Sequence, residues 1–248
     1  MSYARHILYR ALQRLICSTR YKSSTPEVKK VSTPAVQSPI EPHRAKGRPR
    51  SFDRAQALEA ALGVFWKKGF APATIAELCA AMGINPPSLY AAFGNKAQLF
   101  MEAVAHYERL YWDDAWDQIG AEPDVHAAIG GFFTSAARIL TTPDAPCGCV
   151  VVMGAINVPA EFQSVADALR QLREEGRRLF LGRLERGLSD GQLPAGTDVE
   201  TLATTLNTLL QGMSIEASDG ASRARLDQVA VGASAVLPQS SPSIRRHI

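Results

Sequence analysis

The sequence predicts an all-α protein, in which a three-helix unit at residues 46–111 precedes a longer helical domain at residues 112–237. Two observations support this fold class. From residue 53 onward, helix-capping residues, apolar residues at three- and four-residue spacing and terminal glycines recur in the order that helices require. Over the same length, no segment alternates apolar and polar residues as a half-buried strand would. The flanking residues 1–45 and 238–248 are expected to be disordered.

The first helix is predicted at residues 54–68. Asp53 stands at its N-cap in a capping-box pattern, and Gly69 supplies a left-handed residue after its last turn. A second, two-turn helix opens with another capping box at Thr74 and stops at Gly83.

A third short helix follows the turn Gly83-Ile84-Asn85. Asn85 is a good N-cap, Pro86 occupies the first helical position, where its missing N–H costs nothing, and Gly94 ends the helix. Two short helices joined by a three-residue turn that contains Gly form a helix-turn-helix, whose second helix enters the major groove of DNA. The sequence therefore predicts a DNA-binding domain at residues 46–111.

The third helix has a single buried edge, formed by Leu89 and Phe93, so its other side chains face outward. Most of these are small, which lets the helix approach base edges, although Tyr90 could instead be a packing residue. The N-termini of the second and fourth helices favour phosphate, and two arginines before the first helix could reach a phosphate or a minor groove. The predicted DNA-binding residues are Arg48, Arg50, Thr74, Asn85, Pro86, Pro87, Ser88, Tyr90 and Lys96.

Residues 52–104 resemble the N-terminal domain of tetracycline-repressor (TetR/AcrR) family regulators. The resemblance implies a recognition motif from Thr74 to Phe93 and a phosphate-facing Lys96. Pro86-Pro87 departs from the family's usual small or polar pair and leaves the base preference open, and Cys79 stands where Ala is usual. The elements that match are Ala60-Ala61, Phe65, Gly69-Phe70, Thr74-Ile75, Leu78, Ala81, Gly83-Ile84, Ser88-Leu89-Tyr90, Phe93, Lys96 and Leu99-Phe100.

The charge distribution agrees with a DNA-binding N-terminal part. Residues 1–45 hold eight Lys and Arg against two acidic residues, residues 46–111 eight against five, and residues 112–248 eleven against seventeen. Three explanations of the basic N-terminal segment remain open: an arm that follows DNA phosphates, an organelle transit peptide, or a start codon placed too far upstream. Four cysteines without a secretory leader indicate a reducing compartment, and no apolar run could span a bilayer. We therefore expect a cytoplasmic protein with no membrane partner.

Apolar stripes predict further helices in the C-terminal part, and the last two, at residues 198–217 and 222–236, carry more apolar surface than one bundle edge requires. The resemblance implies that these two helices pair with their counterparts in a homodimer. Two DNA-binding domains about 34–36 Å apart would then meet successive major grooves of a palindromic operator in double-stranded DNA. The alternative is that both helices only seal the core of the monomer.

The resemblance also implies that a small-molecule effector, not identified by the sequence, binds inside the C-terminal domain and makes operator binding less favourable. Packing in the core explains the candidate residues equally well. The candidates are Tyr107, Tyr111, Trp112, Trp116, Phe132, Phe133, Met153 and Phe162.

Cys147 and Cys149 suggest an alternative, a thiol- or metal-responsive regulator. No His or further Cys lies nearby in the sequence to complete a tetrahedral metal site, so we predict no metal and no cofactor. A helical enzyme is a weaker alternative, because the sequence lacks phosphate-binding glycine loops and nucleophile motifs, and we expect no catalytic residue. An unregulated architectural DNA-binding protein is disfavoured by the acidic C-terminal part. The leading prediction is a repressor that a small molecule releases from its operator.

Overall fold

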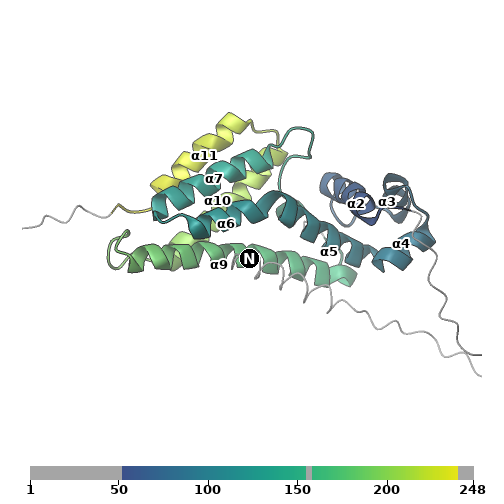
Figure 1. Ribbon diagram of the computed structural model, residues 1–248, viewed down its shortest axis with the longest axis horizontal. Coiled ribbons are helices and arrows are strands. Elements are labelled where there is room, and N and C mark those ends of the chain that lie inside the picture. Colours follow the sequence, from purple (N-terminus) through teal and green to yellow (C-terminus); the bar gives the residue numbers. More distant parts are fainter. Residues whose placement is uncertain (1–51, 155–157, 240–248) are drawn as a thin grey trace, which may run out of the picture.

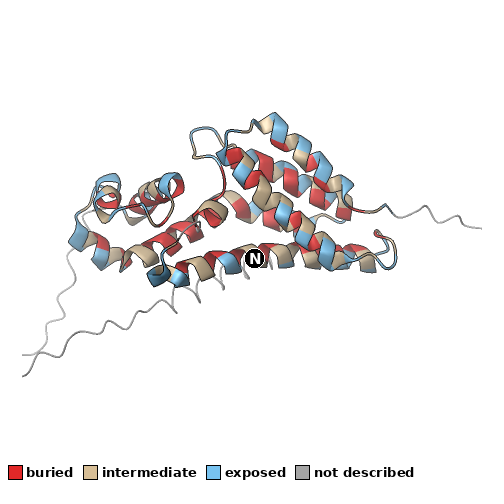
Figure 2. Cartoon of the chain, turned by 180° about the vertical axis from the view of Figure 1, so that it is seen from behind, coloured by how far each residue is buried: buried red, intermediate tan, exposed pale blue. Residues whose placement is uncertain are grey.

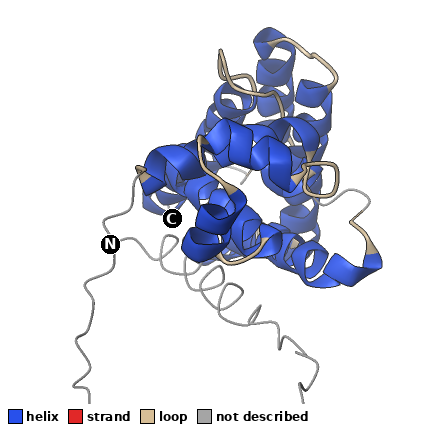
Figure 3. Cartoon of the chain, turned by 90° about the vertical axis from the view of Figure 1, so that its right-hand side faces the viewer, coloured by secondary structure: helices blue, strands red, loops and turns tan. Residues whose placement is uncertain are grey.

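The computed structural model describes residues 52–154 and 158–239, and every element within these ranges is helical (Figure 3). The predicted disorder of residues 1–45 and the predicted roles of Arg48 and Arg50 lie outside the described residues, as does the tail beyond residue 239. The N-terminal elements are α2 (Arg54–Lys68), α3 (Ile75–Met82), α4 (Pro86–Phe93), α5 (Lys96–Tyr107) and the π-helical turn η1 (Glu108–Trp112). They are followed by α6 (Asp113–Ala121), α7 (Val125–Leu140), α8 (Val150–Met153), the 3₁₀ turn η2 (Ala160–Phe162), α9 (Gln163–Ser189), α10 (Val199–Ser218) and α11 (Arg223–Ala235).

Helices α2, α3 and α4 form a small unit at one end of an elongated molecule (Figure 1). The N-caps that the sequence predicted are formed, but Gln56 does not return the hydrogen bond that would complete a capping box at Asp53, and Gly69, with φ of 78° and ψ of 178°, lies outside the left-handed helical region. Asp53 accepts hydrogen bonds from two backbone N–H groups at the start of α2, and Thr74 and Glu77 form a reciprocal capping box at the start of α3. Gly83 ends α3 in the left-handed conformation, with φ of 65°, which glycine adopts without the steric cost of a Cβ. The predicted span of the first helix, Arg54–Lys68, is confirmed.

Helix α5 continues without a break through η1 into α6, so one helical stretch joins the small unit to the larger bundle. The domain boundary expected between residues 111 and 112 falls inside this π-helical turn. A π turn inserts an extra residue into a helix and rotates the side chains that follow it, and such turns are frequent at functional sites.

The larger bundle contains α6 to α11. Helix α11 packs on α7 and α10 packs on α9, while the long α9 runs beside α5 and α6 (Figure 1). Helix α7 coincides with an apolar stripe at residues 125–140, one of the stripes that predict helices in the C-terminal part. Among the described residues, no helix combines the length and apolarity that a bilayer crossing requires.

The buried faces of the helices meet in one continuous hydrophobic core (Figure 2). Phe65 of α2 contacts Phe100 of α5 edge to face at 5.0 Å between ring centroids, which closes the small unit. In the bundle, Phe132 lies 4.3 Å from Trp116 and 5.0 Å from Phe180, again between centroids. The core therefore joins the two parts of the molecule through α5, η1 and α6 rather than leaving them as separate bodies.

Candidate DNA-binding surface and effector cavity

Helix α4 is fixed by one buried edge and leaves the opposite edge to solvent. Leu89 and Phe93 are buried, whereas Pro86 and Pro87 are exposed and the Tyr90 side chain retains 49% of its accessible surface. Small side chains on an exposed helix edge allow the backbone to come close to base edges, and the Tyr90 hydroxyl can donate or accept a hydrogen bond there. This exposure disfavours a packing role for Tyr90.

The start of α4 is held by Asn85, whose side-chain oxygen accepts a hydrogen bond from the Ser88 N–H at 2.9 Å. Asn85 therefore serves first as a helix cap, while its exposed amide group stays available to an outside partner. Ser88 is half-buried, and its position on the first turn keeps it at the edge of the exposed surface.

Thr74, at the start of α3, is exposed but already engaged. Its N–H and hydroxyl both donate to the Glu77 carboxylate, at 3.1 and 3.0 Å, and Glu77 also pairs with Lys68 of α2. The hydrogen bond from Lys68, together with those from Thr74, lowers the pKa of Glu77 to about 2. This network ties the start of α3 to the end of α2.

Lys96, at the start of α5, is folded back onto the loop after α2. Its ammonium group donates to the Ala71 carbonyl oxygen at 3.0 Å and lies 4.7 Å from the centre of the Phe70 ring. Burial lowers the pKa of this ammonium group. The sequence placed Lys96 at a free phosphate-binding position, and the structure adds a second role, in which the same side chain tethers the loop to α5.

A cavity of about 50 Å³ lies in the bundle between the π turn and helices α8, α9 and α10. Its wall is largely apolar, with a few polar groups from three different elements. The lining residues are Glu108, Trp112, Trp116, Cys149, Val151, Val152, Arg173, Asn207, Leu210 and Gln211.

Glu108 is the unusual member of this wall. It retains only 7% of its accessible surface, and within the described residues its carboxyl group has neither a hydrogen-bond partner nor an ion pair. Burial, reinforced by the nearby charge of Asp113, raises the pKa of Glu108 to about 8. At neutral pH the group is therefore mainly protonated, and it can donate one hydrogen bond.

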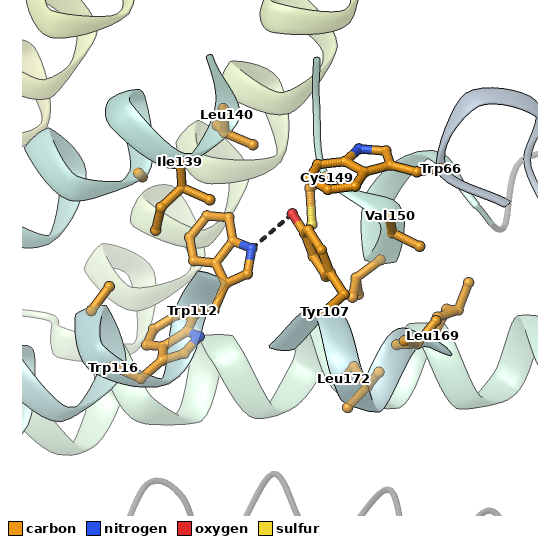
Figure 4. Packing of buried hydrophobic residues seen from close by; sticks show 14 of the residues in the cluster. Trp66, Tyr107, Trp112, Trp116, Ile139, Leu140, Cys149, Val150, Leu169 and Leu172 are labelled. Atoms are coloured by element: carbon orange, nitrogen blue, oxygen red, sulfur yellow. Dashed lines mark hydrogen bonds between the residues drawn. The ribbon is translucent and has the colours of Figure 1, made fainter. Parts of the chain in front are cut away.

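Beside the cavity, three side chains form a buried polar cluster. The indole nitrogen of Trp112 donates to the Tyr107 hydroxyl at 2.8 Å, and the Cys149 sulfur lies next to that hydroxyl (Figure 4). Burial raises the pKa of the Tyr107 hydroxyl and raises that of the Cys149 thiol to about 11. Both groups are therefore neutral at physiological pH.

The structure divides the predicted effector residues into groups. Trp112 and Trp116 line the cavity, and Phe132 lines a second, open hollow of about 350 Å³ between α6 and α7. The other candidates belong to the packed interior or to the boundary between the two parts: Tyr107, Tyr111, Phe133, Met153 and Phe162.

Sequence reasoning missed the polar part of the cavity wall. Glu108, Arg173 and Asn207 come from three separate helices, and none stands in a recognisable motif. One feature of the sequence could have indicated Glu108. It follows Val104 by four residues, so a charged side chain stands on the inward, apolar face of its helix.

Cys147 and Cys149 occupy different environments. Cys147 is exposed, whereas Cys149 is buried at the start of α8, and both carry free thiols. Within the described part of the chain, no group of three or more His, Cys, Asp or Glu side chains gathers closely enough to hold a metal ion.

Comparison with known proteins agrees with this architecture. Residues 57–103 match the family model of bacterial regulatory proteins of the tetR family, and residues 127–230 match a tetracyclin repressor-like C-terminal domain. The chain is 32% identical over 188 residues to the HTH-type transcriptional repressor ComR of Escherichia coli (strain K12), covering 75% of this chain and 90% of that protein. It is 38% identical over 111 residues to the repressor BdcR of the same organism, covering 45% of this chain and 56% of that protein.

A solved structure is also similar. It is a cysteine variant of the TetR family transcriptional regulator CifR complexed with a 26-base-pair operator DNA, with a TM-score of 0.74 and 42% identity, covering 77% of this chain and all of that one. The paired family matches, the length of the match to ComR and this shared fold agree with the helix-turn-helix built from α3 and α4. The chain belongs to the tetR family of bacterial regulatory proteins.

Proposed function

We propose that the protein is a transcriptional repressor that binds an operator in double-stranded DNA through α4. The observation that carries the proposal is the exposed edge of α4, where Tyr90 and the Pro86-Pro87 pair face solvent while Leu89 and Phe93 fix the helix from behind. Both the repressors and the DNA complex to which the chain is similar support the assignment. A protein with this role acts by occupancy rather than by catalysis, and it acts in the cytoplasm, where bacterial DNA lies.

The proposal includes a homodimer. Ile215 of α10 and Val231 of α11 retain 48% and 73% of their accessible surface, so each helix presents an exposed aliphatic side chain in addition to the face it buries. A symmetric contact across these two helices would cover them and would place two α4 helices on a palindromic operator.

The proposal also includes release by a small molecule. The cavity beside Glu108 touches the π turn that links the small unit to the bundle, so an occupant of the cavity could change the orientation of α5. Operator and effector would then weaken each other's binding by the same factor. The buried, protonated Cys149 thiol disfavours a thiol- or metal-responsive mechanism at that residue, while Cys147 is exposed.

The test is selection of bound sequences from a random DNA pool, followed by gel-shift titration of the selected site. We expect a palindromic sequence, and we expect Tyr90→Ala to weaken its binding at least several-fold while the exposed Arg170→Ala, on α9, leaves it unchanged. Selection of no sequence, or equal binding by the Tyr90 variant, would contradict the proposal.

A further inference from the structure

The volume and the lining of the cavity beside η1 indicate which kind of molecule it can hold. By the criterion that one water needs about 10–15 Å³ of such space, a volume of about 50 Å³ corresponds to about four waters. The cavity therefore fits a molecule of about three to five non-hydrogen atoms. Trp112, Trp116, Val151 and Leu210 give it an apolar wall, which favours an occupant that is mainly hydrocarbon.

Two charged side chains reach this wall, and only one of them lacks a hydrogen bond within the described part of the chain. The Arg173 guanidinium of α9 donates one of its N–H groups to the Val151 carbonyl oxygen of α8 at 2.8 Å. The Glu108 carboxyl has no partner of either kind within the described residues. A buried polar group of this kind destabilises the folded chain unless a partner supplies a hydrogen bond.

The groups around Glu108 decide whether that partner accepts or donates. Its own helical stretch brings Tyr107 and Asp113, α8 brings Cys149, α9 brings Arg173, and α10 brings only the neutral amides of Asn207 and Gln211. Asp113 and burial both favour the protonated carboxyl, and no cation pairs with it among the described residues. A protonated carboxyl donates a hydrogen bond, so an acceptor oxygen is the complementary group.

We propose that the effector is a small, uncharged and mainly apolar molecule whose oxygen atom accepts a hydrogen bond from the Glu108 carboxyl group. This inference rests on the proposed function. A cationic occupant would require the carboxylate form and would lie near Arg173 as well. An anionic occupant would lose its hydration against the largely apolar wall, where Arg173 is the one cation among the described lining residues that could compensate it, and the propanoate probe below tests this case. A neutral ketone or ether oxygen meets neither obstacle.

The experiment compares three probes of five non-hydrogen atoms that differ in charge: butan-2-one, sec-butylammonium and propanoate. Binding to the full ¹⁵N-labelled chain is followed through the indole N–H resonances. Trp112 and Trp116 line the cavity, whereas Trp66 lies outside its lining and donates to the Gly148 carbonyl, so its resonance reports whether binding reaches the segment next to the DNA-binding unit. We expect butan-2-one to shift the first two resonances with an affinity about tenfold or more above that of either charged probe.

Two variants and a change of pH test the role of Glu108. Raising the pH from 7 to 9.5 removes most of the proton from a group with pKa about 8, so the affinity for butan-2-one falls about tenfold or more. Glu108→Gln keeps a donor and keeps the affinity at both pH values, whereas Glu108→Leu loses the preference for the ketone. Circular dichroism and the gel shift establish that both variants are folded.

Tighter binding of sec-butylammonium than of butan-2-one would assign Glu108 as a counter-ion and overturn the inference. Equal affinity for butan-2-one in the wild type and in Glu108→Leu would also overturn it. So would the absence of a shift with any of the three probes. If the operator is bound in the same samples while the ketone is not, the inference fails and the proposed DNA-binding function stands. If no operator is bound, the proposed function fails by its own test.

Discussion

The indole nitrogen of Trp66 donates a hydrogen bond to the carbonyl oxygen of Gly148 across 3.0 Å, and this bond connects α2 of the DNA-binding unit to the loop that precedes α8. The next peptide N–H, that of Cys149, donates to the Ser214 hydroxyl of α10 at 2.8 Å. Two successive residues therefore join the DNA-binding unit to a helix of the proposed dimer interface. Cys149 also lines the cavity, so an occupant there would touch the same segment.

Replacing Trp66 by Phe should destabilise the protein. Phe keeps a ring against Tyr107 and Tyr111 but leaves the buried Gly148 carbonyl without its indole donor, at a cost of about 1–3 kcal/mol. Urea unfolding measures the change. Tyr111→Phe is the matched control, because the Tyr111 hydroxyl has no hydrogen-bond partner within the described residues. Equal stability of the two variants would mean that the Trp66 bond contributes nothing.

Gly148 itself should not tolerate a side chain. Its φ is +87°, and a Cβ would lie 2.9 Å from the Ser214 carbonyl oxygen, so Gly148→Ala should cost about 1–3 kcal/mol. Gly182 of α9 has helical backbone, and a Cβ added there would meet nothing within 4 Å, so Gly182→Ala should instead stabilise by about 0.5–1 kcal/mol. Thermal unfolding of both variants gives the comparison, and a stable Gly148→Ala variant would refute the close approach.

Lys96→Ala should change both DNA binding and stability. If Lys96 contacts a phosphate in the complex, its loss lowers the slope of log affinity against log salt by about 0.9. Without DNA, the lost contacts to Ala71 and Phe70 should cost about 1 kcal/mol. Gel shifts at several salt concentrations and urea unfolding measure the two effects separately. An unchanged salt slope would restrict Lys96 to its tethering role.

Glu108 should make stability depend on pH. Its pKa is about 8 in the folded chain against 4.5 for an ordinary Glu, so between these values the folded state holds a proton that the unfolded state has lost. Stability from this group is complete below about pH 4.5 and falls as pH rises toward 8, by at most about 1.4 kcal/mol per unit. Glu108→Gln should remove this component, so its stability relative to the wild type rises from pH 5 to pH 8. A constant difference between the two proteins would contradict the shift.

Val231→Glu should produce a monomer. Val231 is 73% exposed on α11, so a carboxylate there is solvated in the monomer but would be buried without a partner in the proposed dimer. Sedimentation velocity measures the change, and operator affinity should fall with it. Leu110→Glu is the control, since Leu110 is 55% exposed but lies in η1. A dimeric Val231→Glu variant would place the interface elsewhere.

The sequence by itself determined the helices and the helix-turn-helix. Asn85, Pro86 and Gly94 fix the ends of α4 through local hydrogen bonds and backbone geometry, which depend on neighbours within four residues. For the same reason the limits of α2 and α7 follow from Asp53, Asp124 and the apolar spacing between caps. These interactions are short-range, so the order of residues contains them.

Only the tertiary structure decided which residues share the cavity. Glu108, Arg173 and Asn207 are separated by tens of residues, and they meet because α9 and α10 pack against the π turn. Neither the extra residue of that turn nor the contact between Trp66 and Gly148, 82 residues apart, has a local pattern that predicts it. Burial, which sets the protonation of Glu108, is a property of the packed helices and not of any one of them.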